Sequence, residues 1–388
     1  MKANKNELTQ KIKNRPLYDY GKLYTSAASY SEYRPSSISE VQDIIRQART
    51  LKQKVRVRGS GHTFNGCTLP SSSELLIRTD NLNWYRFNEF GSITVGAGAL
   101  MWDIRDFVSS EGFVLPVYNG GWAGPTLGGY INAGGFGKGS LSDEHGGFWE
   151  NVLSITIVNG LGELQVVERN DLNFKWLFSS YGQLGIVVEA KLKILPKSIA
   201  SYLFYTEGGS GRIPKIQSDD PKDNDQLLST TEKKLFWFSL LISSKQEKIA
   251  WQALQKFCQE NPDVIPDGGW AGPLLNQQPI GYHYNVQYKE FNPPLLYPYN
   301  EDFIVVGVMC YFDVGTEKHN LKIKEIEREF ISLALKNKLF LYLQAENIGR
   351  NIDFCAYYGE SIYEQFKLLK RQFDPEFIIN PNVHLKLY

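Results

Sequence analysis

The chain has 388 residues, with 42 Lys or Arg and 42 Asp or Glu, so its formal net charge at pH 7 is zero. This balance gives no electrostatic reason to expect binding to nucleic acid or to an anionic membrane surface. The length leaves room for two domains with a sizeable core. The longest apolar run, Phe303 to Phe312, is too short to cross a bilayer.

The N-terminus and the cysteines bear on the compartment. Residues 1–16 are polar and rich in lysine, without the apolar stretch of a signal peptide. Cys67, Cys258, Cys310 and Cys355 show neither metal-ligand nor CxxC spacing. We therefore expect a cytoplasmic protein with reduced thiols and no metal site.

The first half of the chain predicts helices and strands in alternation. Ser37 and Glu40 form a capping box before a helix whose apolar residues share one face. A half-buried strand follows at Val55. The remaining predictions are strands at 75–77 and 93–95, a helix at 100–110, a hairpin of 152–158 with 163–167, and a strand at 185–195.

Two glycine-containing segments suggest a ligand. The strand at Val55 runs into Gly59-Ser60-Gly61, which His62 follows. Glycine lets the backbone take positive φ and approach a ligand, and successive N–H groups in such a turn suit a phosphate. Alone, this pattern is more often a tight turn with a surface histidine. The second segment, residues 120–137, has too much glycine for a helix, and its apolar residues argue against a linker. It predicts backbone packed against a large flat ligand.

The character of the chain changes near residue 207. Residues 207–226 are rich in Gly, Ser, Pro and Asp, and we expect a mobile loop near the entrance to the pocket. An α+β unit with a pattern of its own follows. Its predicted elements are strands at 235–242 and 303–312, helices at 247–259 and 321–337, and strands near Leu339 and Ile352.

Four segments in this order resemble a known family. They are RVRGSGHTFNG, GPTLGGYINAGGFGKGS, HGGFWENVLSITIVNGLGEL and GQLGIVVEAKLKILP. They are similar to FAD-linked oxidases and dehydrogenases of the vanillyl-alcohol oxidase / p-cresol methylhydroxylase (PCMH) type, over roughly residues 33–197 and a C-terminal tail. The resemblance implies an α+β fold. Its parts would be a two-part FAD-binding domain (1–198), a separate α+β substrate or cap domain (199–357), and a return of the chain to the FAD-binding domain (358–388).

The resemblance also implies how FAD is held. His62 stands where the family's histidine often bonds covalently to the flavin 8α carbon. Gly124 stands where some members carry a second linking cysteine, so one bond is expected. His145 fits a structural role as well as a catalytic one, and Ile186 and Val187 also fit plain strand core. The expected contacts are Arg58, Gly59, Ser60, Gly61, His62, Thr63, Asn65, Gly124, Pro125, Thr126, Gly128, Gly129, Asn132, Gly134, Gly135, Gly137, His145, Gly185, Ile186 and Val187.

The implied chemistry is that of an FAD-dependent oxidoreductase. A hydride would pass to flavin N5 from a C–H next to an OH or NH of a small organic substrate, and oxygen or another acceptor would reoxidise the flavin. A positioned base usually takes the O–H or N–H proton. The candidates are Asp143, Glu144, Glu346 and Tyr357, each of which also fits a surface carboxylate or a packing tyrosine.

The substrate class stays open between two sub-families. PTLGGYINAGGFG and FDPEFIINPN are similar to cytokinin dehydrogenases, but Gly121-Trp122 stand where their catalytic aspartate is expected. RVRGSGHTF is equally similar to sugar-lactone and alditol oxidases, whose Glu-x-Arg pair and His-Trp-Ala-Asp-like ending are missing. Two further alternatives are a flavoprotein that performs a non-oxidative or cyclising step and a fold that only binds a ligand.

Overall fold

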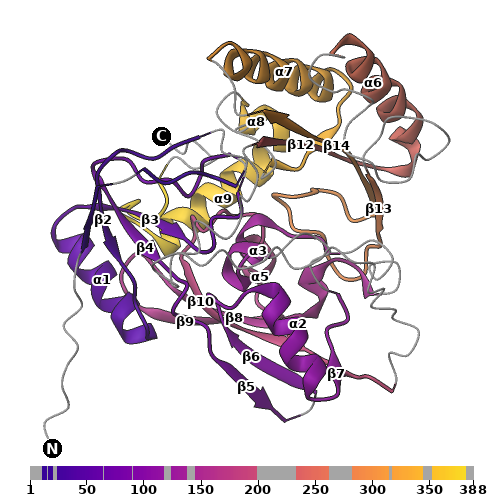
Figure 1. Ribbon diagram of the computed structural model, residues 1–388. Coiled ribbons are helices and arrows are strands. Elements are labelled where there is room, and N and C mark those ends of the chain that lie inside the picture. Colours follow the sequence, from indigo (N-terminus) through magenta and orange to yellow (C-terminus); the bar gives the residue numbers. More distant parts are fainter. Residues whose placement is uncertain are drawn as a thin grey trace, which may run out of the picture.

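The computed structural model of the chain describes residues 11–14, 16–20, 24–63, 65–89, 91–117, 124–137, 145–198, 233–261, 282–313, 317–343 and 352–381. Within these ranges the strands form two four-stranded sheets, one five-stranded sheet and a two-stranded ribbon (Figure 1). The expected entrance loop at 207–226 lies outside the described residues, as do three candidate bases, Asp143, Glu144 and Glu346.

The first sheet contains the strand that leads into the first glycine turn. Its order is β1 (Lys11–Lys13), β2 (Tyr30–Tyr33), β4 (Glu74–Arg78) and β3 (Lys54–Arg58), and both β2 and β3 run parallel to β4. Helix α1 (Ile38–Thr50) precedes β3, as predicted, and buries one apolar face. The Ser37 hydroxyl accepts from the Glu40 N–H, whereas the Glu40 carboxylate accepts from Ser36 rather than Ser37. The cap is therefore a close variant of the expected box.

The five-stranded sheet is antiparallel throughout. It includes the predicted hairpin, formed by β8 (Val152–Val158) and β9 (Leu164–Glu168), and the strand predicted at 185–195, which is β10 (Ile186–Lys193). Helix α2 (Met101–Ser110) confirms the prediction at 100–110, and the ribbon joins β7 (Phe113–Val114) to β11 (Leu195–Pro196). In sheet order the strands are β5 (Tyr85–Asn88), β6 (Ser92–Gly96), β10 (Ile186–Lys193), β8 (Val152–Val158) and β9 (Leu164–Glu168).

The second glycine segment contains a helix, so the prediction that excluded one was wrong. Helix α3 (Leu127–Ala133) begins after Thr126, whose hydroxyl accepts from the Gly129 N–H at 3.2 Å. Glycine disfavours a helix by intrinsic propensity. Here, however, the N–H of Gly128 donates to the Ala97 carbonyl, and a Cβ on Gly128 would lie 3.0 Å from the Ala97 methyl group. The glycine thus allows a contact with the end of β6 that a larger residue would block.

The third sheet follows in the second half of the chain. Its order is β13 (Tyr282–Val286), β14 (Phe303–Asp313), β12 (Lys233–Ile242) and β15 (Phe340–Leu341), all antiparallel. Helices α6 (Glu247–Glu260) and α7 (Glu317–Lys336) lie on the same side of it (Figure 1). Buried side chains of this sheet and of the five-stranded sheet belong to one continuous apolar cluster.

The predicted strand near Ile352 was wrong. Asp353 accepts hydrogen bonds from the N–H groups of Cys355 and Ala356, which makes it the N-cap of helix α8 (Phe354–Tyr358). The strand predicted near Leu339 is confirmed as β15. Helix α7 begins at Glu317, four residues before the predicted start at Leu321.

The C-terminal segment runs back to the first sheet. Helix α9 (Glu360–Phe373) extends from the region of the third sheet toward β3 and β4 (Figure 1). Beyond it, Ile379 forms a parallel bridge with Val55, and the Val55 N–H donates to the Ile378 carbonyl at 2.8 Å. The segment after α9 therefore lies along β3 at the edge of the first sheet, although the two are distant in sequence.

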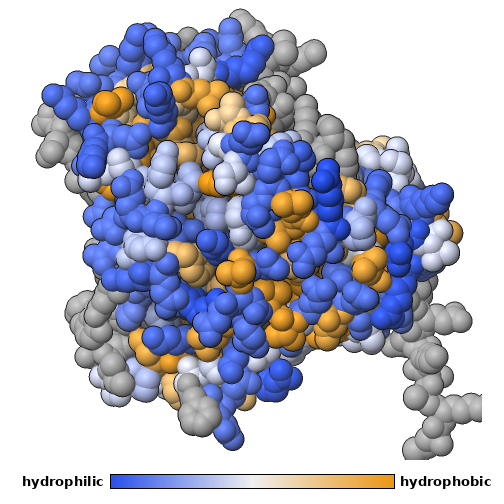
Figure 2. Space-filling view, turned by 180° about the vertical axis from the view of Figure 1, so that it is seen from behind, coloured by the Kyte–Doolittle hydropathy of each residue, from blue (hydrophilic) through white to orange (hydrophobic). Residues whose placement is uncertain are grey.

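Surface and core are separated in the usual way. On the face shown in Figure 2, polar residues predominate and apolar residues form small patches among them. Among the described residues, no helix combines the length and hydropathy needed to span a bilayer.

Short single-turn elements complete the described part of the fold: the 3-10 helices η1 (Phe148–Asn151) and η3 (Ser244–Gln246), and helix α5 (Phe174–Leu177).

Candidate cofactor site

A cavity lies between β3, α3 and the start of β10. The cavity is partly open to solvent. Three segments distant in sequence meet there: the first glycine turn, helix α3 of the second glycine segment, and the turn before β10. The lining residues are Val57, Gly59, Thr63, Cys67, Thr68, Thr79, Gly128, Gly129, Asn132, Ala133, Tyr181, Gly182, Gly185, Ile186, Val187 and Asn380.

The Arg58 side chain packs against the first glycine turn. The Arg58 guanidinium is buried and donates to the Thr68 hydroxyl at 3.0 Å and to the Tyr18 carbonyl at 2.8 Å. Gly61 has a φ of +75°, and a Cβ there would come within 2.2 Å of the Arg58 Nη2 atom. Arg58 therefore supports the turn and is not among the lining residues, although the sequence suggested a cofactor contact.

The two glycine segments contact each other. The Ser60 hydroxyl donates to the Gly124 carbonyl at 3.3 Å, and a Cβ on Gly59 would lie 2.2 Å from the Thr126 Oγ1 atom. A side chain at Gly59 would push the turn away from the N-terminus of α3. These contacts join the two segments, although Ser60, Gly124 and Thr126, which were predicted as cofactor contacts, do not themselves line the cavity.

His62 lies near the end of this turn but is not among the residues that line the cavity. Its ring lies beside the Tyr20 ring, with 4.4 Å between the centroids. Part of the residue reaches solvent, but its Nδ1 atom is shielded from it. Burial lowers the pKa of His62 from its ordinary value of 6.5 to about 4. The imidazole is therefore neutral at pH 7, the form in which a ring nitrogen acts as a nucleophile.

Helix α3 presents its backbone and one amide side chain to the cavity. Gly129 is exposed on the lining face, and Asn132 follows one turn later on the same face. Gly134, Gly135 and Gly137 do not line the cavity. A Cβ on Gly135 would lie 2.0 Å from the Tyr130 ring, so this glycine serves internal packing.

Gly134 offers a test of how tightly this segment is packed. Its φ is +68°, and a Cβ would meet the Ser179 hydroxyl at 1.9 Å. Gly112 has a similar φ of +83°, but a Cβ there would meet no described atom within 4 Å. We expect Gly112→Ala to cost about 1–2 kcal/mol of backbone strain and Gly134→Ala to cost about 1–3 kcal/mol more through overpacking. Urea unfolding of the two variants measures the difference, and equal losses would contradict the packing argument.

The turn before β10 forms the third wall. Gly185, Ile186 and Val187 line the cavity, yet the side chains of Ile186 and Val187 are buried in separate apolar clusters. These two residues therefore offer mainly backbone to the cavity. Tyr181 precedes them, and its N–H donates to the Asn132 carbonyl at 2.9 Å, which joins this wall to α3.

Other predicted residues lie outside the cavity lining. Asn65 is buried and accepts from the Cys67 N–H while donating to the Leu343 carbonyl, so it shapes the chain after the first turn. His145 stands just before η1. The Tyr357 hydroxyl accepts from the Leu341 N–H at 2.5 Å, and burial raises the Tyr357 pKa above its ordinary value. Tyr357 is therefore held at β15 by a backbone contact.

Several residues that line the cavity could not be predicted from the sequence. Thr68, Thr79, Tyr181, Gly182 and Asn380 carry no motif of their own and reach the cavity through the fold. Cys67 also lines the cavity. Burial raises the pKa of its thiol to about 12, so the thiol is protonated and unreactive at neutral pH.

These residues fit FAD. Glycine on all three walls leaves backbone groups open to a ligand, and Thr63, Thr68 and Thr79 add hydroxyl groups. A Cβ on Gly59 would displace the wall at Thr126. When bound, FAD supplies a two-electron acceptor. Among the described residues, no group of three or more His, Cys, Asp or Glu is placed to hold a metal ion.

Known proteins share these segments. Residues 32–168 match the family model described as FAD binding domain. The D-arabinono-1,4-lactone oxidase of Saccharomyces cerevisiae is 30% identical over 193 residues, which cover 47% of this chain and 35% of that protein. The D-arabinono-1,4-lactone oxidase of Yarrowia lipolytica is 27% identical over 254 residues, 63% of this chain and 44% of that protein. An uncharacterized oxidoreductase of the fasciation locus in Rhodococcoides fascians is 29% identical over 164 residues, 41% of this chain and 36% of that protein.

The matched regions thus span less than half the length of these relatives. They include the first glycine turn, the second glycine segment and the hairpin of β8 with β9, which are the segments on which the resemblance was based. The chain therefore carries an FAD-binding domain and is similar in sequence to D-arabinono-1,4-lactone oxidases.

Proposed function

We propose that the protein is an FAD-dependent oxidoreductase that oxidises a C–H next to a hydroxyl group in a small polyhydroxylated substrate of the lactone type. The observation that carries this proposal is the cavity with three glycine-containing walls inside the matched FAD-binding domain. The names of the relatives favour a hydroxy-lactone over an amine. The substrate gives up a hydride and a proton, that is two electrons and two protons, and oxygen or another acceptor takes the electrons.

Within this proposal, different parts of the chain bind different parts of the cofactor and the substrate. The Gly59–Thr63 turn would hold the pyrophosphate, and the backbone at Gly185, Ile186 and Val187 would hold the adenine end. The third sheet would supply the substrate side. Asp143, Glu144 and Glu346 remain the candidates for the base that takes the hydroxyl proton. Tyr357 is no longer one, because burial raises its pKa and keeps its hydroxyl protonated at neutral pH.

His62 would hold the flavin covalently. A bond would form between an imidazole nitrogen and the 8α carbon, with loss of one proton from the 8α carbon and one from the imidazole. The two electrons released would leave through the acceptor. The neutral state of His62, which follows from its lowered pKa, supports this role.

Absorption spectroscopy and a substrate test decide the proposal. We expect a yellow protein with the visible bands of oxidised flavin. Mixing with D-arabinono-1,4-lactone without oxygen should bleach these bands, and admitting air or a dye should restore them. A secondary amine tested in the same way serves as the control substrate.

A colourless protein that gains no bands on adding FAD would overturn the whole proposal. Bleaching by the amine alone would move the substrate class to amine oxidation. A product formed without bleaching and without use of an acceptor would indicate a non-oxidative reaction instead.

A further inference from the structure

We propose that Asn380 is a positioning residue of the FAD cavity, because its side-chain amide fixes the wall at Tyr181 and Gly182 relative to β3. The inference rests on the FAD binding proposed above. It goes beyond that proposal by assigning a role in cofactor affinity to the C-terminal segment after α9. That segment lies outside the residues matched by the FAD-binding family model.

The Asn380 amide contacts two walls of the cavity at once. Its Oδ1 atom accepts from the Val57 N–H at 2.8 Å, and its Nδ2 atom donates to the carbonyls of Tyr181 at 3.1 Å and Gly182 at 3.2 Å. Asn380, Val57, Tyr181 and Gly182 all line the cavity. The backbone N–H of Asn380 also donates to the Val55 carbonyl at 2.8 Å. One side chain therefore spans the gap between β3 and the turn before β10.

The turn at Tyr181 and Gly182, which Asn380 contacts, has a backbone conformation that needs support from neighbouring groups. Tyr181 and Asn380 have φ values of +53° and +43°, which residues with side chains rarely adopt, and Gly182 has +68°. Such conformations persist where surrounding contacts support them. A Cβ on Gly182 would lie 2.7 Å from the Asn380 Nδ2 atom, so the amide packs directly against this turn.

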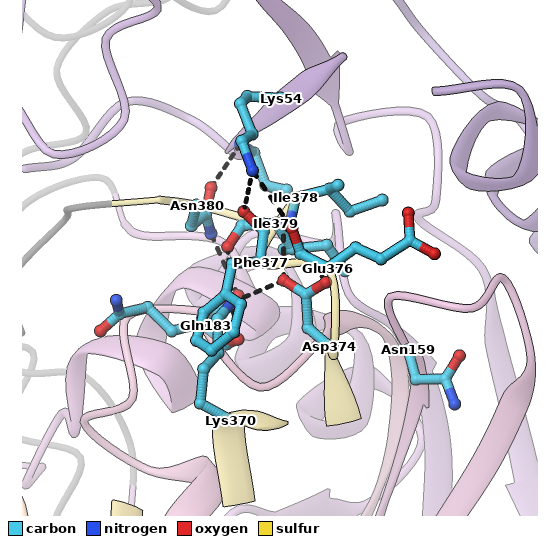
Figure 3. Close-up of polar contacts among 12 residues, drawn as sticks. Lys54, Asn159, Gln183, Lys370, Asp374, Glu376, Phe377, Ile378, Ile379 and Asn380 are labelled. Carbon is cyan, nitrogen blue, oxygen red and sulfur yellow. Dashed lines mark hydrogen bonds and ion pairs between the residues drawn. The ribbon is translucent and has the colours of Figure 1, made fainter. Parts of the chain in front are cut away.

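Helix α9 anchors both sides of this contact (Figure 3). The Lys370 ammonium donates to the Gln183 carbonyl at 2.6 Å and to the Ile379 carbonyl at 2.9 Å. Gln183 directly follows the held wall, and Ile379 directly precedes Asn380. The Asp374 carboxylate accepts from Lys370 and from the N–H groups of Ile378 and Ile379. These bonds fix the backbone on both sides of the contact and therefore fix the position of the Asn380 amide.

Asn292 serves as a control that distinguishes a purely structural role of Asn380 from a positioning role. Asn292 is 4% exposed and Asn380 is 5% exposed. The Asn292 Nδ2 atom also donates to two carbonyls, those of Tyr299 and Glu301, each at 2.8 Å. Asn292 does not line the cavity. Both asparagines therefore donate to two carbonyls from a buried position, and only Asn380 lines the cavity.

The experiment measures FAD affinity in a His62→Ala background, so that the flavin binds reversibly whether or not the covalent bond forms. Apoprotein with Asn380→Ala, with Asn292→Ala and without a further change is titrated with FAD, and the quenching of flavin fluorescence is followed. Thermal midpoints are recorded without FAD. We expect both variants to lose stability but only Asn380→Ala to bind FAD about tenfold more weakly, since two cavity carbonyls lose their donor.

Visible circular dichroism of the bound flavin adds a readout that stability does not move, and it should change only with Asn380→Ala. If Asn380→Ala is insoluble, Asn380→Ser replaces it with the same expected direction. Equal FAD affinities for the Asn380 and Asn292 variants would overturn the inference. Absence of FAD binding by the background protein and by the unmodified chain would instead overturn the proposed function.

Discussion

Lys370→Met is expected to destabilise the protein by about 3–5 kcal/mol, because it leaves the buried Asp374 carboxylate without its cation. Lys370 and Asp374 are both fully buried, and 2.6 Å separates the Nζ and Oδ2 atoms. Burial lowers the pKa of Lys370, and the nearby Asp374 carboxylate opposes that shift. The three acceptors around Nζ nevertheless match the three donors of an ammonium group. The variant also removes two bonds to backbone carbonyls.

Lys367→Met is the matched control. Lys367 lies one turn earlier on α9 and pairs with Glu364 at 2.7 Å, but Glu364 is about half exposed to solvent. Surface pairs of this kind contribute about 0–1 kcal/mol. Urea unfolding of both variants, followed by tryptophan fluorescence at saturating FAD, compares the two losses. A small loss for Lys370→Met, similar to that of the control, would show that the pair does not hold the C-terminal segment.

The local parts of the site were predictable from sequence because their signals are local. The strand, the glycine turn and His62 are adjacent in the chain, and the hairpin of β8 with β9 has its own turn. Each of these is decided by periodicity and turn chemistry within about ten residues. The structure places them as the sequence indicated.

Tertiary contacts decided the features that the sequence did not predict. Glycine content argued against α3, yet the contact of Gly128 with Ala97 outweighs the low helix propensity. Apolar residues near Ile352 suggested a strand, but Asp353 caps a helix there. The position of Asn380 at the cavity depends on a contact with Tyr181, which is 199 residues away in the chain. A single sequence carries no local signal for such a pair.

His62→Ala is expected to abolish covalent flavin while leaving FAD bound to the folded protein. The reason is position and protonation: His62 ends the turn that would hold the pyrophosphate, and burial lowers its pKa to about 4, so the nucleophilic neutral form prevails at pH 7. The backbone walls at Gly59 and Gly185, which remain intact, would still bind the cofactor. The substrate-driven reduction of the flavin should be slower, since an 8α substituent makes the flavin a stronger oxidant.

His145→Ala is the control for this prediction, because His145 is a second histidine of the described chain and lies outside the first glycine turn. After acid denaturation, flavin should stay with the pellet in the unmodified protein and in His145→Ala, and pass to the supernatant in His62→Ala. Intact mass gives the same answer, since only the first two proteins would exceed the polypeptide mass by one FAD. Flavin wholly in the supernatant of the unmodified protein would show that no bond forms. Flavin retained in the pellet of His62→Ala would assign the bond to another residue.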